Sequence, residues 1–155
     1  MTISGFFRTP VAGGLGRFAV LAIIPCSLLA AAQISSVADP DVSPAVAITI
    51  DSENLIELYQ SVPDIRIVDS RLRGDYAMGH IELSHNLPVS ETNCQSLSRL
   101  AEDRDTAMVF YCNGGKGKAS TEALQIASSC GYRRLFWLRG GFIEWQDKDY
   151  PFVIE

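Results

Sequence analysis

The alternation of strand and helix patterns after residue 45 is the feature that most limits how this chain can fold. Short apolar, partly β-branched runs predict strands at 45–50, 65–68, 83–87, 106–111 and 135–138. Helical spacing of apolar residues predicts helices from Ser52 to before Pro63, and at 71–78, 92–102, 118–130 and 142–146. This order predicts an α/β fold with a mainly parallel sheet and helices on both faces. We expect Trp137, Phe142 and Trp145 in its core.

The most clearly predicted strand, TAMVFY at 106–111, leads directly into a glycine-rich segment that begins at Cys112. Ligands of parallel sheets bind at loops that follow the carboxyl ends of strands. Gly114, Gly115 and Gly117 allow the backbone to curl and to bring several N–H groups around one point. The segment therefore predicts a functional loop with a cysteine at its start.

This loop can activate a thiol and hold a small anion. Lys116 and Lys118 add positive charge, and the amino end of the next predicted helix adds unpaired N–H groups and a positive dipole end. Such surroundings stabilise a thiolate, so Cys112 is the candidate catalytic nucleophile. The candidate substrate-binding residues are Asn113, Gly114, Gly115, Lys116, Gly117 and Lys118. The alternative interpretation is a small buried cysteine before an ordinary loop.

Other chemistry finds little support in the same segment. The spacing of a phosphate-binding P-loop is absent, and no second cysteine or histidine lies at zinc-ligand spacing from Cys112. We therefore expect neither a metal nor a cofactor. The net charge of −5 gives no reason to expect a nucleic-acid partner.

The first 38 residues differ from the rest and predict a cleavable signal peptide. Arg8 and Arg17 are their only charged residues, and residues 18–32 form an apolar run. This run is shorter than the roughly 20 residues of a membrane-spanning helix. Cleavage after Ala38, which we favour over cleavage after Ala32, leaves a linker at 39–44 and a domain at 45–155. The expected location is the periplasm or the exterior, with no stable membrane span after cleavage; an uncleaved N-terminal anchor is the alternative.

Removal of the signal peptide changes both the charge and the cysteine count. Residues 1–38 hold two of the 13 basic residues and none of the 18 acidic ones, so the remainder carries 11 minus 18, a net charge of −7. Three cysteines remain, at Cys94, Cys112 and Cys130. Cys94 and Cys130 either form a disulfide that leaves Cys112 as the odd thiol, or both are unpaired.

Four segments carry a family resemblance, in order along the chain. They are IVDSR at 67–71, DYAMGHIELSHNLP at 75–88, VFYCNGGKGKAS at 109–120 and LFWLRGGFIEW at 135–145. Together they resemble the motifs of a rhodanese domain, and the likeness extends from about residue 48 to residue 151. The resemblance implies a central, mainly parallel five-stranded sheet.

The resemblance also implies a reaction. Cys112 would take the outer sulfur of thiosulfate or a similar small anionic donor as a persulfide, and pass it to a thiol, a protein thiol or cyanide. Asp69 and Arg71 match family positions that we interpret as fold-stabilising. His80 matches a structural turn, so it is not our candidate base.

Two residues depart from the family pattern. Many members have Arg-Ser five and six residues after the cysteine, where this chain has Gly117 and Lys118. Lysine supplies charge without the planar fork of arginine. A non-catalytic sulfur carrier or partner-binding module is therefore an alternative to a catalyst. A phosphatase or arsenate reductase is a weaker alternative, because lysine cannot bind a phosphoryl group through the two parallel hydrogen bonds that arginine makes.

Overall fold

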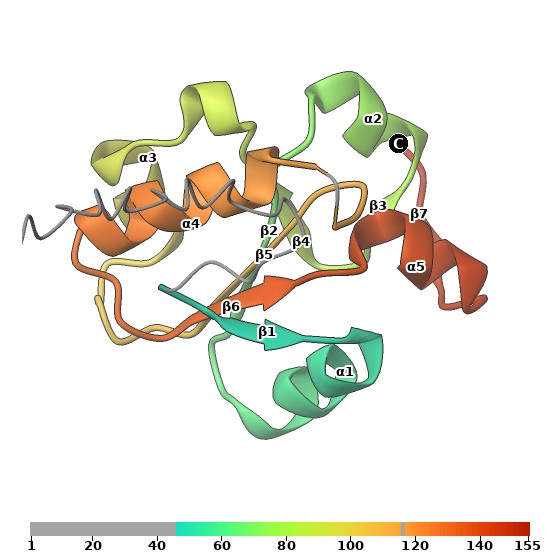
Figure 1. Ribbon diagram of the computed structural model, residues 1–155, viewed down its shortest axis with the longest axis horizontal. Helices are drawn as coiled ribbons and strands as arrows, with labels where there is room; N and C mark the ends of the chain where they lie inside the picture. Colours follow the sequence, from blue (N-terminus) through green and yellow to red (C-terminus); the bar gives the residue numbers. More distant parts are fainter. Residues whose placement is uncertain (1–45, 116) are drawn as a thin grey trace, which may run out of the picture. The chain divides into compact units, whose positions relative to one another are not determined.

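The computed structural model describes residues 46–115 and 117–155, which contain a five-stranded parallel sheet (Figure 1). The spatial order of the strands is β1-β6-β5-β2-β4. Their bounds are Ile48–Ile50 (β1), Arg66–Asp69 (β2), Ser84–Asn86 (β4), Met108–Tyr111 (β5) and Leu135–Leu138 (β6). All four pairings are parallel. The predicted α/β class and parallel sheet are confirmed.

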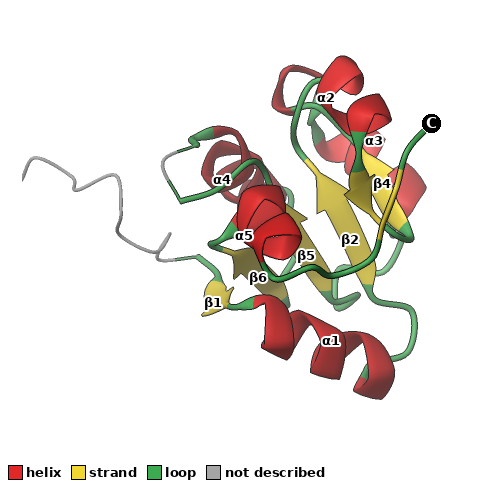
Figure 2. Ribbon diagram, turned by 90° about the vertical axis from the view of Figure 1, so that its right-hand side faces the viewer, coloured by secondary structure: helices red, strands yellow, loops and turns green. Residues whose placement is uncertain are grey.

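Helices cover both faces of this sheet, as Figures 1 and 2 show. Their bounds are Ser52–Ser61 (α1), Arg73–Met78 (α2), Cys94–Leu100 (α3), Ala119–Ser129 (α4) and Gly141–Asp147 (α5). On one face, residues of α3 and α4 pack with Met108 and Phe110 of β5. On the other, residues of α1 and α5 pack with Val109 and Tyr111. Successive side chains of a strand point to opposite faces, so β5 contributes to both cores and is completely buried.

Three tryptophan and phenylalanine side chains lie in these cores, as the sequence predicts. Trp137 belongs to the core beneath α4, whereas Phe142 and Trp145 belong to the core beneath α1. Trp145 also donates its indole N–H to the carbonyl oxygen of Pro151 at 2.9 Å. Both tryptophans of the chain are therefore held by packing and by at least one hydrogen bond.

The structure corrects several predicted element boundaries. The sequence also suggests Ser52 as the residue that caps α1, but the cap is Asp51, whose side chain accepts from the Asn54 N–H at 2.8 Å. Ser52 is instead buried and donates to Glu144. Leu135–Leu138 is not the last strand, because β7 (Phe152–Val153) pairs antiparallel with β3 (His80–Ile81). A 3₁₀ helix, η1 (Val89–Glu91), precedes α3. Such two- and three-residue elements are too short to show a periodicity in sequence.

A disulfide joins Cys94, the first residue of α3, to Cys130 at the end of α4. Their Cα atoms lie 5.3 Å apart, within the range that a disulfide requires. Of the two alternatives for these cysteines, the structure has the bonded one. Cys112 is then the only free cysteine among the described residues.

The predicted signal peptide at 1–38, the linker at 39–44 and Lys116 lie outside the described residues. Within the part of the chain that the structure describes, no helix is long and apolar enough to cross a membrane.

Candidate active site around Cys112

Cys112 immediately follows β5, and its backbone is fixed to the start of α5. The Phe142 N–H donates to the Cys112 carbonyl oxygen at 2.9 Å, and the Ile143 N–H donates to that of Asn113 at 3.0 Å. The approach is close because Gly141 has a φ of +60° and no side chain. A Cβ atom there would lie 2.3 Å from the Cys112 carbonyl oxygen. The glycine at the first position of α5 therefore allows the helix to hold the cysteine in place.

The sulfur of Cys112 is buried beneath its own loop, with the residue only 4% exposed. Its nearest polar neighbours in the described loop are two carbonyl oxygens, of Gly117 at 3.5 Å and of Gly114 at 3.6 Å. The Gly117 N–H points elsewhere, to the Gly114 carbonyl at 2.8 Å. The sequence predicts a ring of amide groups around the sulfur, whereas the structure places carbonyl oxygens of the same glycines beside it. The thiol group can donate a hydrogen bond to either of these carbonyl oxygens.

Ser120 is a site residue that the sequence analysis did not identify. It lies in the first turn of α4, is completely buried, and donates its hydroxyl to the Cys112 sulfur at 3.2 Å. The indole Nε1 of Trp137 on β6 donates in turn to the Ser120 hydroxyl oxygen at 3.1 Å. The one sequence sign of this role was a hydroxyl residue in the first turn after the loop.

The other predicted loop residues that the structure describes differ in their exposure to solvent. Asn113 and Lys118 are exposed, and Gly114, Gly115 and Gly117 are half-buried. Lys118 is the residue before α4, and no side-chain hydrogen bond caps this end of the helix. The first-turn N–H groups of a helix have no partner within the helix itself, and the Lys118 side chain does not supply one.

Asp69 and Arg71 form a buried ion pair beside the loop. The Arg71 Nε lies 3.0 Å from both carboxylate oxygens, and its Nη2 donates to Asp69 at 2.5 Å and to the Gly79 carbonyl at 2.7 Å. Its Nη1 lies 3.4 Å from Oδ1 of Asn113, the neighbour of Cys112. Burial lowers the pKa of Arg71, but the hydrogen bond and charge of Asp69 outweigh it and raise that pKa above its ordinary value. The guanidinium therefore stays charged and connects β2 to the loop.

Tyr111 completes the buried polar layer under the loop. Its hydroxyl accepts from the Ile81 N–H at 3.2 Å and lies 3.0 Å from the Ser84 hydroxyl. Burial, followed by the charge of Asp69, raises the pKa of Tyr111 above its ordinary value, so the phenol remains neutral. His80 lies apart from the sulfur's contacts, with its ring stacked on Tyr76 and its Nδ1 3.0 Å from the Tyr76 carbonyl oxygen.

Comparison with known proteins decides the family. The model of the rhodanese-like domain matches residues 52–148. The chain belongs to the rhodanese-like domain family. This domain is 34% identical over 104 residues to a sulfurtransferase of Allochromatium vinosum, an alignment that covers 67% of this chain and 92% of that protein. The family is of sulfurtransferase type.

Solved structures show the same fold. A rhodanese-related protein of Thermoplasma volcanium is 25% identical, with a TM-score of 0.54, over 70% of this chain and 99% of that one. A Bacillus halodurans protein has a TM-score of 0.63 at 23% identity, over 70% of this chain and 77% of that one.

The rhodanese-like fold gives a physical reason for the glycine at position 117. A Cβ atom at this position would lie 2.7 Å from the Cys112 sulfur and 3.2 Å from the Gly114 carbonyl oxygen. A real Cβ does not approach another atom so closely. With this loop conformation, the position at which many family members carry arginine has no room for any side chain.

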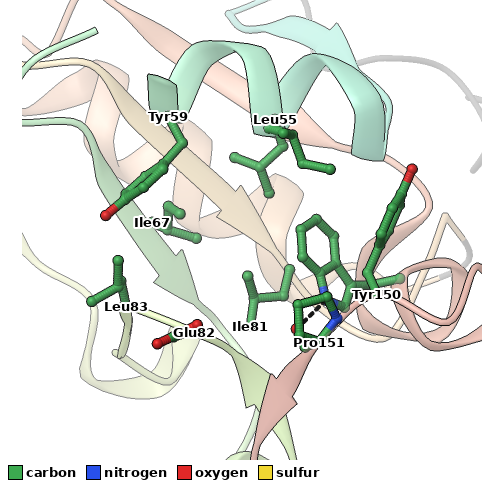
Figure 3. Close-up of a pocket in the computed structure, with 10 residues that line it drawn as sticks. Leu55, Tyr59, Ile67, Ile81, Glu82, Leu83, Tyr150 and Pro151 are labelled. Atoms are coloured by element: carbon green, nitrogen blue, oxygen red, sulfur yellow. Dashed lines mark hydrogen bonds between the residues drawn. The ribbon is translucent and has the colours of Figure 1, made fainter. Parts of the chain in front are cut away.

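The rhodanese-like domain also has an apolar cavity of about 260 Å³ away from this loop (Figure 3). It lies between α1 and the segment around β3, and its lining includes Leu55, Tyr59, Ile81 and Tyr150. None of the lining residues that the structure describes belongs to the loop after Cys112. Among the described residues, no group of three or more histidine, cysteine or acidic side chains could hold a metal ion.

Proposed function

We propose that this rhodanese-like domain is a sulfurtransferase that carries sulfane sulfur as a persulfide on Cys112. The observation that carries the proposal is a free cysteine at the end of the central strand, whose sulfur accepts a hydrogen bond from Ser120. The other two cysteines of the domain are bonded to each other, so they do not compete for the sulfur. The likeness to a sulfurtransferase supports the same conclusion.

The reaction needs no oxidant, reductant or metal ion. The Cys112 thiol loses its proton to solvent, and the thiolate attacks the outer sulfur of thiosulfate. A sulfur–sulfur bond to Cys112 forms while the bond to the sulfonate sulfur breaks, and sulfite leaves with that electron pair. A thiol, a protein thiol or cyanide then attacks the outer sulfur, and the Cys112 thiolate leaves. Each step is a nucleophilic substitution at sulfur.

The donor anion binds, in this proposal, at the loop and the amino end of α4. The uncapped first-turn N–H groups of that helix and the charge of Lys118 favour an anion there. Asn113 is exposed beside the sulfur and is in contact with Arg71. The proposed binding set is the predicted one, Asn113, Gly114, Gly115, Lys116, Gly117 and Lys118, to which Ser120 is added as a contact of the sulfur.

Export to the periplasm or the exterior, after removal of residues 1–38, is part of the proposal. The Cys94–Cys130 disulfide supports it, because disulfides persist mainly in oxidising compartments. Anchoring by an uncleaved N-terminal segment is the alternative, and sizing of the mature N-terminus by mass spectrometry separates the two.

A non-catalytic sulfur carrier is the second candidate. Carbonyl oxygens lie beside the sulfur, and position 117 has no arginine to bind a leaving oxyanion. Both features disfavour rapid release of sulfite. A carrier would accept one sulfur atom per chain and would not turn over.

The test is steady-state transfer of sulfur from thiosulfate to cyanide by the purified protein and by its Cys112→Ser variant. Many turnovers by the parent and none by the variant are expected. If the parent gains the mass of one sulfur atom on Cys112 without turnover, the carrier replaces the catalyst. If no sulfane donor modifies Cys112, both candidates are wrong.

A further inference from the structure

We propose that Trp137 is a positioning residue for Cys112, and that it acts through Ser120. Its indole N–H forces the Ser120 hydroxyl to donate its hydrogen to the sulfur. The inference deepens the proposed function and rests on it for its biological purpose, although its test measures the sulfur itself. None of the sequence motifs indicates this role, because Trp137 also has an ordinary place in the core.

The three residues are joined by two consecutive hydrogen bonds, and all three are buried. Cys112 follows β5, Ser120 is on α4 and Trp137 is on β6, and they are 4%, 0% and 1% exposed. The indole Nε1 lies 3.1 Å from the Ser120 oxygen, which lies 3.2 Å from the sulfur. Water therefore has little access to the serine hydroxyl, whose described partners are these two groups.

The chemistry of the indole determines the direction of the hydrogen bonds. An indole N–H can only donate, so the Ser120 oxygen must accept from Trp137. The hydroxyl hydrogen is left for the sulfur, the other neighbour of this hydroxyl among the described residues. The opposite orientation, with the thiol donating to Ser120, would leave the hydroxyl hydrogen without a described acceptor in a buried site, which is costly.

The thiol continues the same direction toward the loop. It can donate to the carbonyl oxygen of Gly117 or Gly114, at 3.5 and 3.6 Å. The complete series of hydrogen bonds then leads from the indole N–H to the serine hydroxyl, from the hydroxyl to the thiol, and from the thiol to a carbonyl oxygen. Hydrogen bonds in such a line polarise and strengthen one another.

The direction matters most after the proton leaves. The same two carbonyl oxygens carry partial negative charge and repel a thiolate at that distance. Ser120 is then the described group that donates a hydrogen bond to the sulfur. A serine free to turn its hydroxyl away would lose this stabilisation for part of the time, whereas Trp137 keeps the donor pointed at the sulfur.

Trp145 offers a matched control within the same domain. It is also buried, 6% exposed, and its Nε1 also donates one hydrogen bond, to the Pro151 carbonyl at 2.9 Å. That bond has no connection with Cys112. Replacement of either tryptophan by phenylalanine removes an indole N–H and part of a core side chain, but only one of the two replacements touches the line to the sulfur.

The experiment measures the rate of Cys112 alkylation by iodoacetamide at neutral pH in the full protein and in four variants. Ser120→Ala should slow alkylation about tenfold or more, the effect of losing a hydrogen bond to a charged group. Trp137→Phe should slow it about threefold to tenfold, and should add nothing in the Ser120→Ala background. Trp145→Phe should leave the rate unchanged, even where it lowers stability by a similar amount.

The two indole N–H resonances of the unmodified chain provide a second measurement that needs no variant. Alkylation of Cys112 should shift the ¹⁵N–¹H resonance of Trp137 and leave that of Trp145 in place. Equal alkylation rates for the two phenylalanine variants, or an unmoved Trp137 resonance, would overturn the inference. A protein with the expected alkylation pattern but no sulfur uptake would retain the inference and lose the proposed function.

Discussion

The glycine at position 117 shows how much a single missing side chain can decide. A Cβ atom at this position would lie 2.7 Å from the Cys112 sulfur. In the sequence, Gly117 stands where many members of the family have arginine. The sequence could not give the reason, because the distance between residue 117 and the sulfur depends on how the whole loop closes.

We predict that Gly117→Ala displaces the sulfur and lowers kcat for sulfur transfer about 100-fold, the scale of a misplacement of about 1 Å. Restoring the family's arginine by Gly117→Arg should fail for the same reason. Gly74→Ala in α2 is the control, since nothing lies within 4 Å of a Cβ there. Similar kcat values for Gly117→Ala and Gly74→Ala would contradict the steric argument.

The buried Asp69–Arg71 ion pair is a second place where a single side chain decides the outcome. Loss of the guanidinium would leave a completely buried carboxylate without its partner. We predict that Arg71→Met lowers the free energy of unfolding by about 3–5 kcal/mol. Arg73→Met, which breaks an ion pair whose side chains are 70% and 47% exposed, should cost at most about 1 kcal/mol. Urea denaturation monitored by tryptophan fluorescence measures both, and equal losses would show that burial is not the deciding factor.

At the scale of elements, the sequence predicted the strands of the central sheet but neither of the two-residue strands. β5 is apolar at every position because both of its faces are covered, so its composition alone indicates a central strand. β3 and β7 have two residues each, and they pair His80 with Val153 and Ile81 with Phe152, far apart in the chain. Two residues show no alternation, so neither strand can be recognised from a local pattern.

In the candidate site, too, the sequence reveals what is local along the chain and not what packing brings together. Cys112 and its glycines could be found because they are adjacent in sequence and follow a recognisable strand. Ser120 and Trp137 could not be linked to them, because the link depends on which faces of α4 and β6 meet in the core. The orientation of the loop carbonyls was equally out of reach, since either face of a peptide can point inward at glycine.

The Cys94–Cys130 disulfide joins α3 to α4, and its contribution to stability can be predicted. It joins residues 36 positions apart, and closing such a loop in the unfolded chain corresponds to about 4 kcal/mol in the chain-entropy account. We predict that the Cys94→Ser, Cys130→Ser double variant loses about 2–4 kcal/mol of unfolding free energy. Chemical denaturation of the two proteins gives the difference. The parent treated with a reductant should match the variant; no loss in either would mean that the bond closes a segment already held by packing.

At the scale of the whole molecule, three tyrosine side chains make the stability of the fold decline at alkaline pH. Burial raises the pKa of Tyr76, Tyr111 and Tyr132 above the ordinary value of the side chain. A folded-state pKa above the unfolded one means that the folded chain holds its protons more tightly. This contribution to stability is fully present below the unfolded pKa of about 10, and is lost as the pH rises from there through the folded-state pKa.

We therefore predict that the free energy of unfolding falls as the pH rises above about 10. Tyr111→Phe should lower stability at neutral pH, since Ile81 and Ser84 lose their partner, but should flatten the alkaline decline. Urea denaturation at a series of pH values provides the comparison. Parallel pH profiles for parent and variant would show that other groups cause the decline.

The line from Trp137 through Ser120 to Cys112 has a further consequence for the newly made chain. Its members come from β6, α4 and the end of β5, and they meet only when the central layers of the domain have closed. Before that point the cysteine is an ordinary thiol without its donor. The hydrogen bond to the sulfur is therefore a property of the folded domain alone, and a partly folded chain presents Cys112 without it.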